Sequence, residues 1–165
     1  MQRLHILNSK ERKGFHALLA QQFGFTGEIN GVIMRNEKKE RYLIFTRDLA
    51  GFDTGALKID AMGLYIAAFM KGKLRLTIEG AERIGPHATK NVIALNDTET
   101  AAWIAGGSIP LDIIEADVGG IPDGTFVIVR HGDDWLGCGR KSDAFLHNYI
   151  PKTRQVRAAF EPAPA

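Results

Sequence analysis

The sequence predicts an α+β protein with a mixed first domain and a small, strand-rich, barrel-like second domain. Three observations support this: one amphipathic helix near the start, short β-rich runs separated by turn residues, and a Gly85-Pro86 break near the middle. The chain has 165 residues, 45% apolar and 24% charged, which is sufficient for a packed core. We predict domains at residues 1–85 and 86–158, followed by a flexible tail at residues 159–165.

The first predicted element is an amphipathic helix with a signal at each end. Asn8 is followed three residues later by Glu11, which is the spacing of a capping box at a helix start. Gly24 is suited to end the helix as a C-terminal cap, so we expect a helix over residues 9–23. Its apolar residues recur at helical spacing and define one buried face: Phe15, Leu18, Leu19 and Phe23.

The rest of the first domain is predicted to be strands and short helical turns. A hairpin is expected around the polar turn Asn36-Glu37-Lys38-Lys39, and Lys71-Gly72-Lys73 marks a second turn. The expected strands are residues 31–34, 42–46, 59–69 and 74–78. Single helical turns are expected at residues 47–51 and 79–84.

The second domain is predicted to contain one short helix among strands. Asn96 or Asp97 is suited to cap a helix over residues 98–105, which Gly106-Gly107 would end. His131-Gly132-Asp133-Asp134 is a strong hairpin signal, and residues 119–124 form a glycine-rich loop. The expected strands are residues 91–95, 109–114, 125–130, 135–138 and 145–149.

The cysteine content and the N-terminal residues indicate an intracellular protein. Cys138 is the single cysteine, so no internal disulfide is possible and a reducing compartment is expected. The N-terminus carries charge from Arg3 onward and lacks an apolar signal core. The longest apolar run, residues 61–70, is about half of the ~20 residues that span a bilayer. We therefore expect a soluble cytoplasmic protein without a membrane partner.

Charge is distributed unevenly along a chain that is only mildly basic overall. The net charge is +2 and the isoelectric point is about 8.7, which permits a nucleic-acid partner without requiring one. An acidic block is followed by a basic block. The acidic block is Asp112, Glu115, Asp117, Asp123, Asp133 and Asp134. The basic block is Arg140, Lys141, Lys152, Arg154 and Arg157. Such blocks are also common on ordinary solvated surfaces.

The second half resembles a PUA domain, the small β-barrel named after pseudouridine synthases and archaeosine transglycosylases. Four segments carry the resemblance: NVIALNDTETAAWIAGGSI, GGIPDG, TFVIVR and DWLGCGRKSD. The segment KIDAMGLYIAAFMKGKLRLTIEGAERIGPHATKNVIAL is similar to the pre-PUA to PUA junction of the Nip-type (Nip-seven) ribosome-assembly factors. The ending AFLHNYIPKTRQV is more similar to the PUA region of Nol/Nop/Sun RNA cytosine methyltransferases. The resemblance implies a pre-PUA domain, a PUA barrel that binds RNA, and protein contacts through the first half.

Together, the resemblance and the basic block predict an RNA-binding surface at the C-terminal edge. Lysine and arginine neutralise phosphates, and the expected phosphate contacts are Arg140, Lys141, Lys152, Arg154 and Arg157. Tyr149 and His147 are candidates to stack on an unpaired base. Gly106 and Gly107 would let an RNA backbone approach closely. For the basic block, the alternative is a solvated strand edge whose charge discourages aggregation. For the two glycines, the alternative is that they only end the preceding helix. Scattered cations near the junction are weaker candidates to extend this surface: Lys71, Lys73, Arg75, Arg83 and Lys90.

No pattern in the sequence indicates catalysis, a cofactor or a metal site. A glycine-rich cofactor loop after a strand is absent, and the five histidines lack metal-ligand spacing. Cys138 lies between two glycines, where small size alone explains it. Asp133 and Asp134 are adjacent turn residues rather than a carboxylate pair, and Trp103 is expected in the core.

Three functions are compatible with these observations. The leading hypothesis is a non-catalytic RNA-binding accessory factor for ribosomal RNA in ribosome biogenesis, with tRNA as the other RNA and assembly or modification proteins as partners. The second is an RNA-targeting subunit that acts in trans with an RNA-modifying methyltransferase. The third is a protein-interaction module without an RNA role, which the weak net charge supports.

Overall fold

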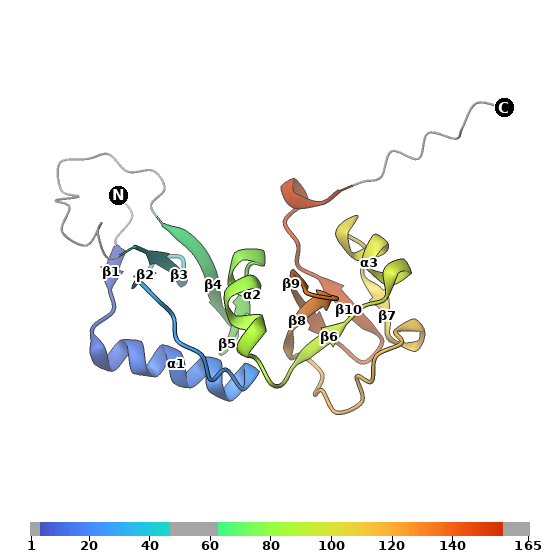
Figure 1. Ribbon diagram of the computed structural model, residues 1–165, viewed down its shortest axis with the longest axis horizontal. Coiled ribbons are helices and arrows are strands. Elements are labelled where there is room, and N and C mark those ends of the chain that lie inside the picture. Colours follow the sequence, from blue (N-terminus) through green and yellow to red (C-terminus); the bar gives the residue numbers. More distant parts are fainter. Residues whose placement is uncertain (1–3, 47–62, 157–165) are drawn as a thin grey trace.

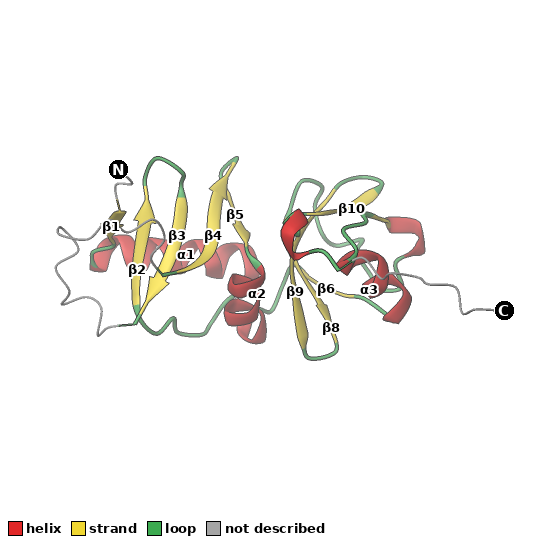
Figure 2. Cartoon of the chain, turned by 90° about the horizontal axis from the view of Figure 1, so that it is seen from above, coloured by secondary structure: helices red, strands yellow, loops and turns green. Residues whose placement is uncertain are grey.

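The computed structural model describes residues 4–46 and 63–156 (Figure 1). Three predictions fall partly or wholly outside these residues: the helical turn at 47–51, the start of the strand at 59–69, and the flexible tail. Two sheets lie side by side, and helix α2 stands at the junction between them (Figure 2). No helix in the described part of the chain is long and apolar enough to cross a bilayer.

The first sheet contains five strands within the described residues, in the order β1-β2-β3-β4-β5, and every neighbouring pair is antiparallel. The strands are β1 (Leu4–Ile6), β2 (Val32–Asn36), β3 (Arg41–Phe45), β4 (Leu64–Met70) and β5 (Lys73–Leu76). The predicted hairpin between β2 and β3 is confirmed, as is the turn between β4 and β5.

Helix α1 (Ser9–Phe23) has the bounds and the caps that the sequence predicts. The Asn8 side chain accepts a hydrogen bond from the Glu11 amide at 3.0 Å, and the Glu11 carboxylate accepts one from the Asn8 amide at 2.8 Å. Gly24 ends the helix with a φ of 60°, which costs glycine little. The apolar face packs on the first sheet, where the Phe15 and Tyr42 rings stack at 4.4 Å.

Strand β5 ends earlier than predicted because helix α2 (Ile78–Ile84) begins at Ile78. The Thr77 hydroxyl accepts a hydrogen bond from the Gly80 amide at 3.0 Å, so Thr77 caps the helix. Apolar alternation alone does not distinguish Ile78 from the strand residues before it. A 3₁₀ turn, η3 (Gly85–His87), follows α2 directly, so the Gly85-Pro86 break ends the α-helix without ending helical geometry.

The second sheet also contains five strands within the described residues, in the order β6-β8-β9-β10-β7. Strands β6 and β8 are parallel, and the other neighbours are antiparallel. The strands are β6 (Val92–Ala94), β7 (Ile109–Pro110), β8 (Phe126–His131), β9 (Asp134–Lys141) and β10 (Phe145–Asn148). Helix α3 (Asp97–Ile104) is capped by Asn96, and Trp103 on it is fully buried, as expected.

The predicted strand at residues 109–114 is wrong beyond Pro110. Strand β7 has two residues, and the 3₁₀ turn η4 (Leu111–Ile113) follows it. Pro110 lacks an amide hydrogen and has a φ of −59°, which suits a turn better than a continuing strand. Of the apolar residues that indicated a strand here, Leu111 is partly buried and Ile113 is exposed.

The second sheet contributes to two hydrophobic clusters. Side chains alternate along β8, so Phe126 and Ile128 lie on one face and Val127 and Val129 on the other. The first pair packs into a cluster with residues of the first half: Phe15, Leu19, Phe23, Ile66, Leu74, Leu76, Ala81 and Ile84. The second pair packs with Trp103, Ile93, Ile109 and Leu146 in a core confined to the second half. The two halves therefore share one apolar cluster, which we call the shared core.

We expect Ile128→Ala to lower the free energy of unfolding by about 2–5 kcal/mol, because it leaves a cavity in the shared core. Both halves should still unfold in one transition. Tryptophan fluorescence reports on the second half, where Trp103 and Trp135 lie, and far-ultraviolet circular dichroism also reports on α1. Urea unfolding curves from the two probes should coincide. Separated midpoints would contradict a shared core, and Lys13→Ala on the exposed face of α1 is the control.

Candidate nucleic-acid interface

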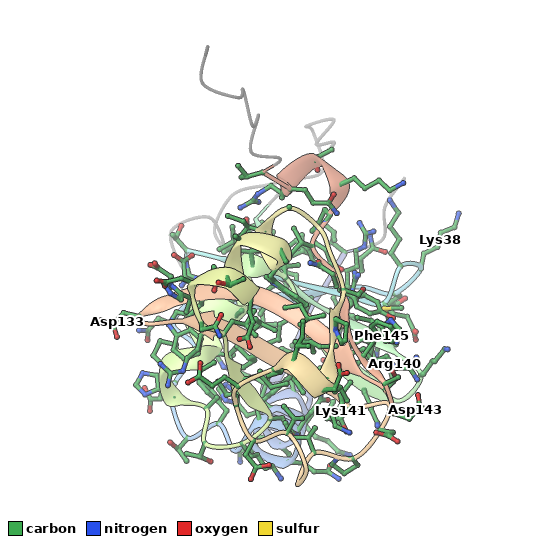
Figure 3. The ribbon with its side chains drawn as sticks, turned by 90° about the vertical axis from the view of Figure 1, so that its right-hand side faces the viewer. Lys38, Asp133, Arg140, Lys141, Asp143 and Phe145 are labelled. Atoms are coloured by element: carbon green, nitrogen blue, oxygen red, sulfur yellow. The ribbon has the colours of Figure 1, made fainter. Side chains whose placement is uncertain are left out.

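Strands β9 and β10 present a cation and two rings on one face of the second sheet, the face from which Phe126 and Cys138 enter the shared core. Arg140 lies directly opposite His147 in the register of the two strands. Phe145 precedes His147 by two residues, so both rings leave the same side of β10, while Leu146 between them is buried. The two rings are 6.0 Å apart, and Phe145 is 41% exposed. We call Arg140, Phe145 and His147 the β9–β10 strip; Arg140 and Phe145 lie close together in Figure 3.

In the turn between β9 and β10, one hydroxyl contacts the backbone of Phe145 and the ring of His147. The Ser142 side chain accepts a hydrogen bond from the Phe145 amide at 3.1 Å. The same oxygen is 3.0 Å from Nε2 of His147, which fixes the orientation of the imidazole ring. The strip is thus held by backbone pairing and by a local side-chain contact, and little ordering is required when a ligand binds.

Cations from both halves meet beside this strip. Nε of Arg140 donates to the Gly124 carbonyl at 3.4 Å, and Nζ of Lys73 donates to the same carbonyl at 3.3 Å. Within the described residues neither side chain forms a salt bridge. Neither cation is thus paired directly with a described carboxylate, although Asp143 lies on the same side of the molecule as Arg140 (Figure 3). Both cations can still contact a phosphate.

Lys141 does not join this surface. Its side chain is 10% exposed, and Nζ forms a salt bridge with Asp123 at 2.6 Å. The pair ties the glycine-rich loop at residues 119–124 to the end of β9. Since its charge is buried and paired, Lys141 supports the loop rather than offering a free cation, which differs from the expectation that it contacts phosphate.

Tyr149 is held between neighbours from both halves. Its ring meets the edge of Phe126 at 5.4 Å with an interplanar angle of 85°, and the Arg75 guanidinium lies 5.6 Å from the ring centre. The residue is partly buried against the shared core. A base that stacks here would have to share the ring with Arg75, so Tyr149 is less open than the sequence suggests.

The basic block is divided by the fold. Lys152 and Arg154 lie on the 3₁₀ turn η5 (Lys152–Arg154), which is seen at the top of the ribbon in Figure 3, away from Arg140. Lys152 is exposed, whereas Arg154 donates to the Glu79 carboxylate on α2. Burial raises the pKa of Glu79, but the Arg154 hydrogen bond, a backbone hydrogen bond and the Arg154 charge together lower it below its ordinary value. Arg157 lies outside the described residues.

Gly106 and Gly107 are required by the packing around them. From the sequence alone, this role cannot be distinguished from the predicted close contact with an RNA backbone. A Cβ at Gly106 would lie 2.3 Å from the Gln155 side chain, and the residue has a φ of +93°. A Cβ at Gly107 would lie 3.0 Å from the Ala102 carbonyl oxygen. Gln155 thus occupies the space above Gly106 that an RNA backbone was expected to use.

Two features bear on the candidate metal and nucleophile sites. No three His, Cys, Asp or Glu side chains in the described ranges gather as metal ligands. Cys138 is buried in the shared core, and burial raises the pKa of its thiol to about 12. The thiol therefore stays protonated at neutral pH and is a poor nucleophile.

Phe145 is the candidate that sequence reasoning missed. It was placed in the last strand, but its exposure was not anticipated. The signal was present: strict alternation around a buried Leu146 puts residues 145 and 147 on one face. Which face is open to solvent depends on the neighbouring strands, and these are separated from β10 in the chain.

The second half matches a known family, and the fold matches known structures. Residues 90–155 match the family described as the methyltransferase RsmF PUA domain. A conserved PUA domain protein from Thermoplasma acidophilum is similar at a TM-score of 0.61 and 12% identity, covering 92% of this chain and 97% of that chain. A hypothetical protein from Pyrococcus horikoshii is similar at a TM-score of 0.58 and 15% identity, covering 94% of this chain and 100% of that chain. No curated protein sequence matches this chain.

These comparisons confirm two predictions. The chain has an α+β fold with a PUA-type barrel, and the PUA resemblance of the second half is confirmed at the level of the domain. The likeness to the two archaeal structures shows a common fold. The narrower resemblance to the Nip-type factors stays a prediction.

Cys138 should be unreactive in the folded protein. At pH 8 we expect almost no carbamidomethylation by iodoacetamide, because the thiol is buried and its pKa is raised to about 12. The same treatment in guanidinium chloride should modify the cysteine fully. Intact-mass spectrometry distinguishes these states. Rapid modification of native protein, with unchanged circular dichroism, would show that the thiol is accessible and reopen a nucleophilic role.

Proposed function

We propose that this protein is a non-catalytic RNA-binding accessory factor whose PUA-type half contacts RNA through the β9–β10 strip. The observation that carries the proposal is the exposed Phe145 beside His147 and Arg140, which forms no salt bridge among the described residues, on a domain that matches a PUA family. Folded RNA offers phosphates for the cation and unpaired bases for the rings. The proposal includes Lys152, the first residue of η5, as a further phosphate contact.

Ribosomal RNA is the proposed ligand, and ribosome biogenesis the proposed process. The first support is the resemblance of the junction between the halves to that of the Nip-type assembly factors. The second is an accessible surface whose cation and rings are suited to bind the RNA backbone and unpaired bases. The first half would contact assembly proteins or extend the RNA site. A cytoplasmic location is part of the same proposal.

A second candidate function is RNA targeting in trans for a methyltransferase. It is favoured by one specific observation: the matching family is described as the PUA domain of the methyltransferase RsmF. The same strip would then deliver RNA to a separate catalytic protein.

The first test is RNA binding by fluorescence anisotropy with ribosomal RNA fragments and tRNA. Arg140→Ala should weaken binding and reduce the salt dependence, because one phosphate contact is lost. Phe145→Ala should cost about 1–3 kcal/mol of binding free energy if a base stacks on the ring. Tighter binding of ribosomal RNA than of tRNA is expected.

The matched control is Arg130→Ala. Arg130 donates to the Gly132 carbonyl, next to Asp133, which Figure 3 shows on the opposite side from Arg140. This variant removes the same charge as Arg140→Ala and should bind RNA like the wild-type protein. Equal losses in both arginine variants would indicate a general charge effect, and no binding by the wild-type protein at low salt would overturn the proposal.

The targeting function is tested by mixing the protein with an RNA cytosine methyltransferase catalytic domain and its RNA. Under this second proposal we expect a higher methylation rate at subsaturating RNA, and Phe145→Ala should abolish the increase. An unchanged rate at every protein concentration would exclude this role for the enzyme tested. Methyl transfer from labelled S-adenosylmethionine gives the rate.

A further inference from the structure

Two arginines and two tyrosines alternate across the junction between the halves. The Arg41 guanidinium lies 4.9 Å from the centre of the Tyr65 ring. Arg75 donates to the Tyr65 hydroxyl at 3.3 Å and lies 5.6 Å from the centre of the Tyr149 ring. The four residues come from β3, β4, β5 and the segment after β10. We call Arg41, Tyr65, Arg75 and Tyr149 the arginine–tyrosine ladder.

Strand register explains why the ladder lies on one side of the first sheet. Arg41 pairs with Ala68, and Ala68 pairs with Arg75, so both arginines leave the same face of neighbouring strands. Tyr42, adjacent to Arg41, leaves the other face and stacks on Phe15 of α1. The ladder is therefore on the sheet face opposite α1, and it is not part of the core beneath that helix.

The ladder is continuous with the β9–β10 strip. Tyr149 meets Phe126, which lies opposite Arg140 in the β8–β9 register. Lys73, two residues before Arg75 on β5, shares the Gly124 carbonyl with Arg140. Figure 3 also shows Lys38, in the turn before β3, on the same side of the molecule as Arg140 and Phe145. One surface thus runs from the first sheet to β10.

The two ladder arginines are not paired with a carboxylate of the described residues. Among the described residues, Arg41 and Arg75 form no salt bridge, and Nε of Arg75 is buried without a hydrogen-bond partner. Arg41 is exposed, and the other three ladder residues are partly exposed. The tyrosines hold the guanidinium groups in place, so less side-chain entropy is lost when a ligand binds.

We infer that the ladder and the β9–β10 strip form one binding site for a single-stranded segment of RNA that crosses from the PUA-type half onto the first half. This inference rests on the RNA binding proposed above and assigns part of the site to the first half. Phosphates would contact Arg41, Arg75, Lys73 and Arg140. Unpaired bases would stack on exposed ring and guanidinium planes.

Alternating cations and rings favour a single strand over a duplex. In an RNA duplex the bases are stacked on each other, so a protein surface meets mainly phosphates and 2′-hydroxyls. The tyrosine rings of the ladder would then have no unpaired base to stack on. In a single strand each nucleotide offers one phosphate and one free base face, which matches an alternation of arginine and tyrosine.

The test compares two RNA probes at several salt concentrations. One is a labelled single strand of about 12 nucleotides, and the other is a hairpin duplex of similar charge. We expect the double variant Arg41→Ala/Arg75→Ala to weaken single-strand binding about tenfold or more. The slope of log affinity against log salt should fall by about 0.7 for each lost phosphate contact. Hairpin binding should change less than twofold.

Tyrosine variants test the ring contribution separately from charge. Tyr65→Leu should weaken single-strand binding, and Tyr65→Phe should retain most of it, because the ring is kept. Arg130→Ala is again the charge-matched control. Thermal melts identify any variant that fails to fold; in that case Arg41→Ala alone, at an exposed position, is expected to weaken single-strand binding without loss of stability.

Failure of this inference can be distinguished from failure of the proposed function. Single-strand binding that is unchanged in the double variant but weakened by Arg140→Ala would confine the site to the PUA-type half and overturn the inference alone. Equal losses on the single strand and the hairpin would overturn the single-strand assignment. No binding of either RNA by the wild-type protein would overturn the proposed function together with the inference.

Discussion

Strand β8 couples the two halves because its side chains alternate between two apolar clusters. Phe126 and Ile128 enter the shared core, while Val127 and Val129 enter the core of the second half. One strand therefore belongs to two apolar clusters, and neither half can move away from the other without exposing buried rings and aliphatic groups to water. Interdomain contacts are often smaller and more polar than this, and they then permit motion. Here the packing favours one rigid arrangement of the two halves.

That arrangement determines which polar side chains meet at the surface. With β8 in place, β9 and β10 follow by antiparallel pairing, and Arg140 comes to lie between Phe126 and His147. The contact of β5 with the same strands brings Lys73 to the Gly124 carbonyl and Arg75 to Tyr149. Groups from distant parts of the chain are thus held in fixed positions before any ligand arrives. Preorganisation of this kind lowers the entropic cost of binding an extended, flexible ligand such as an RNA strand.

The elements that the sequence predicts well are those whose signals are local. The capping boxes at Asn8 and Asn96 each satisfy helix amides three residues away, and the hairpin around Gly132 needs only its own turn. Where the prediction was wrong, two local preferences competed. Ile78 continues the apolar alternation of β5, yet the Thr77 cap makes it the first residue of α2. Residues after Pro110 are apolar enough for a strand, but the chain turns into η4 after a two-residue strand that ends at the proline.

The fold class, most helices and strands, and the basic C-terminal block can be predicted from the sequence alone, because propensity, periodicity and charge are properties of short segments. Which of those charges are free depends on tertiary packing. Lys141 is paired with Asp123, Arg154 with Glu79, and the space over Gly106 is filled by Gln155, whereas Arg140 meets no described carboxylate. Each partner is distant in sequence, and no local pattern encodes it. Exposure and neutralisation depend on the packing of the whole chain, so a surface site becomes visible only after the chain has folded.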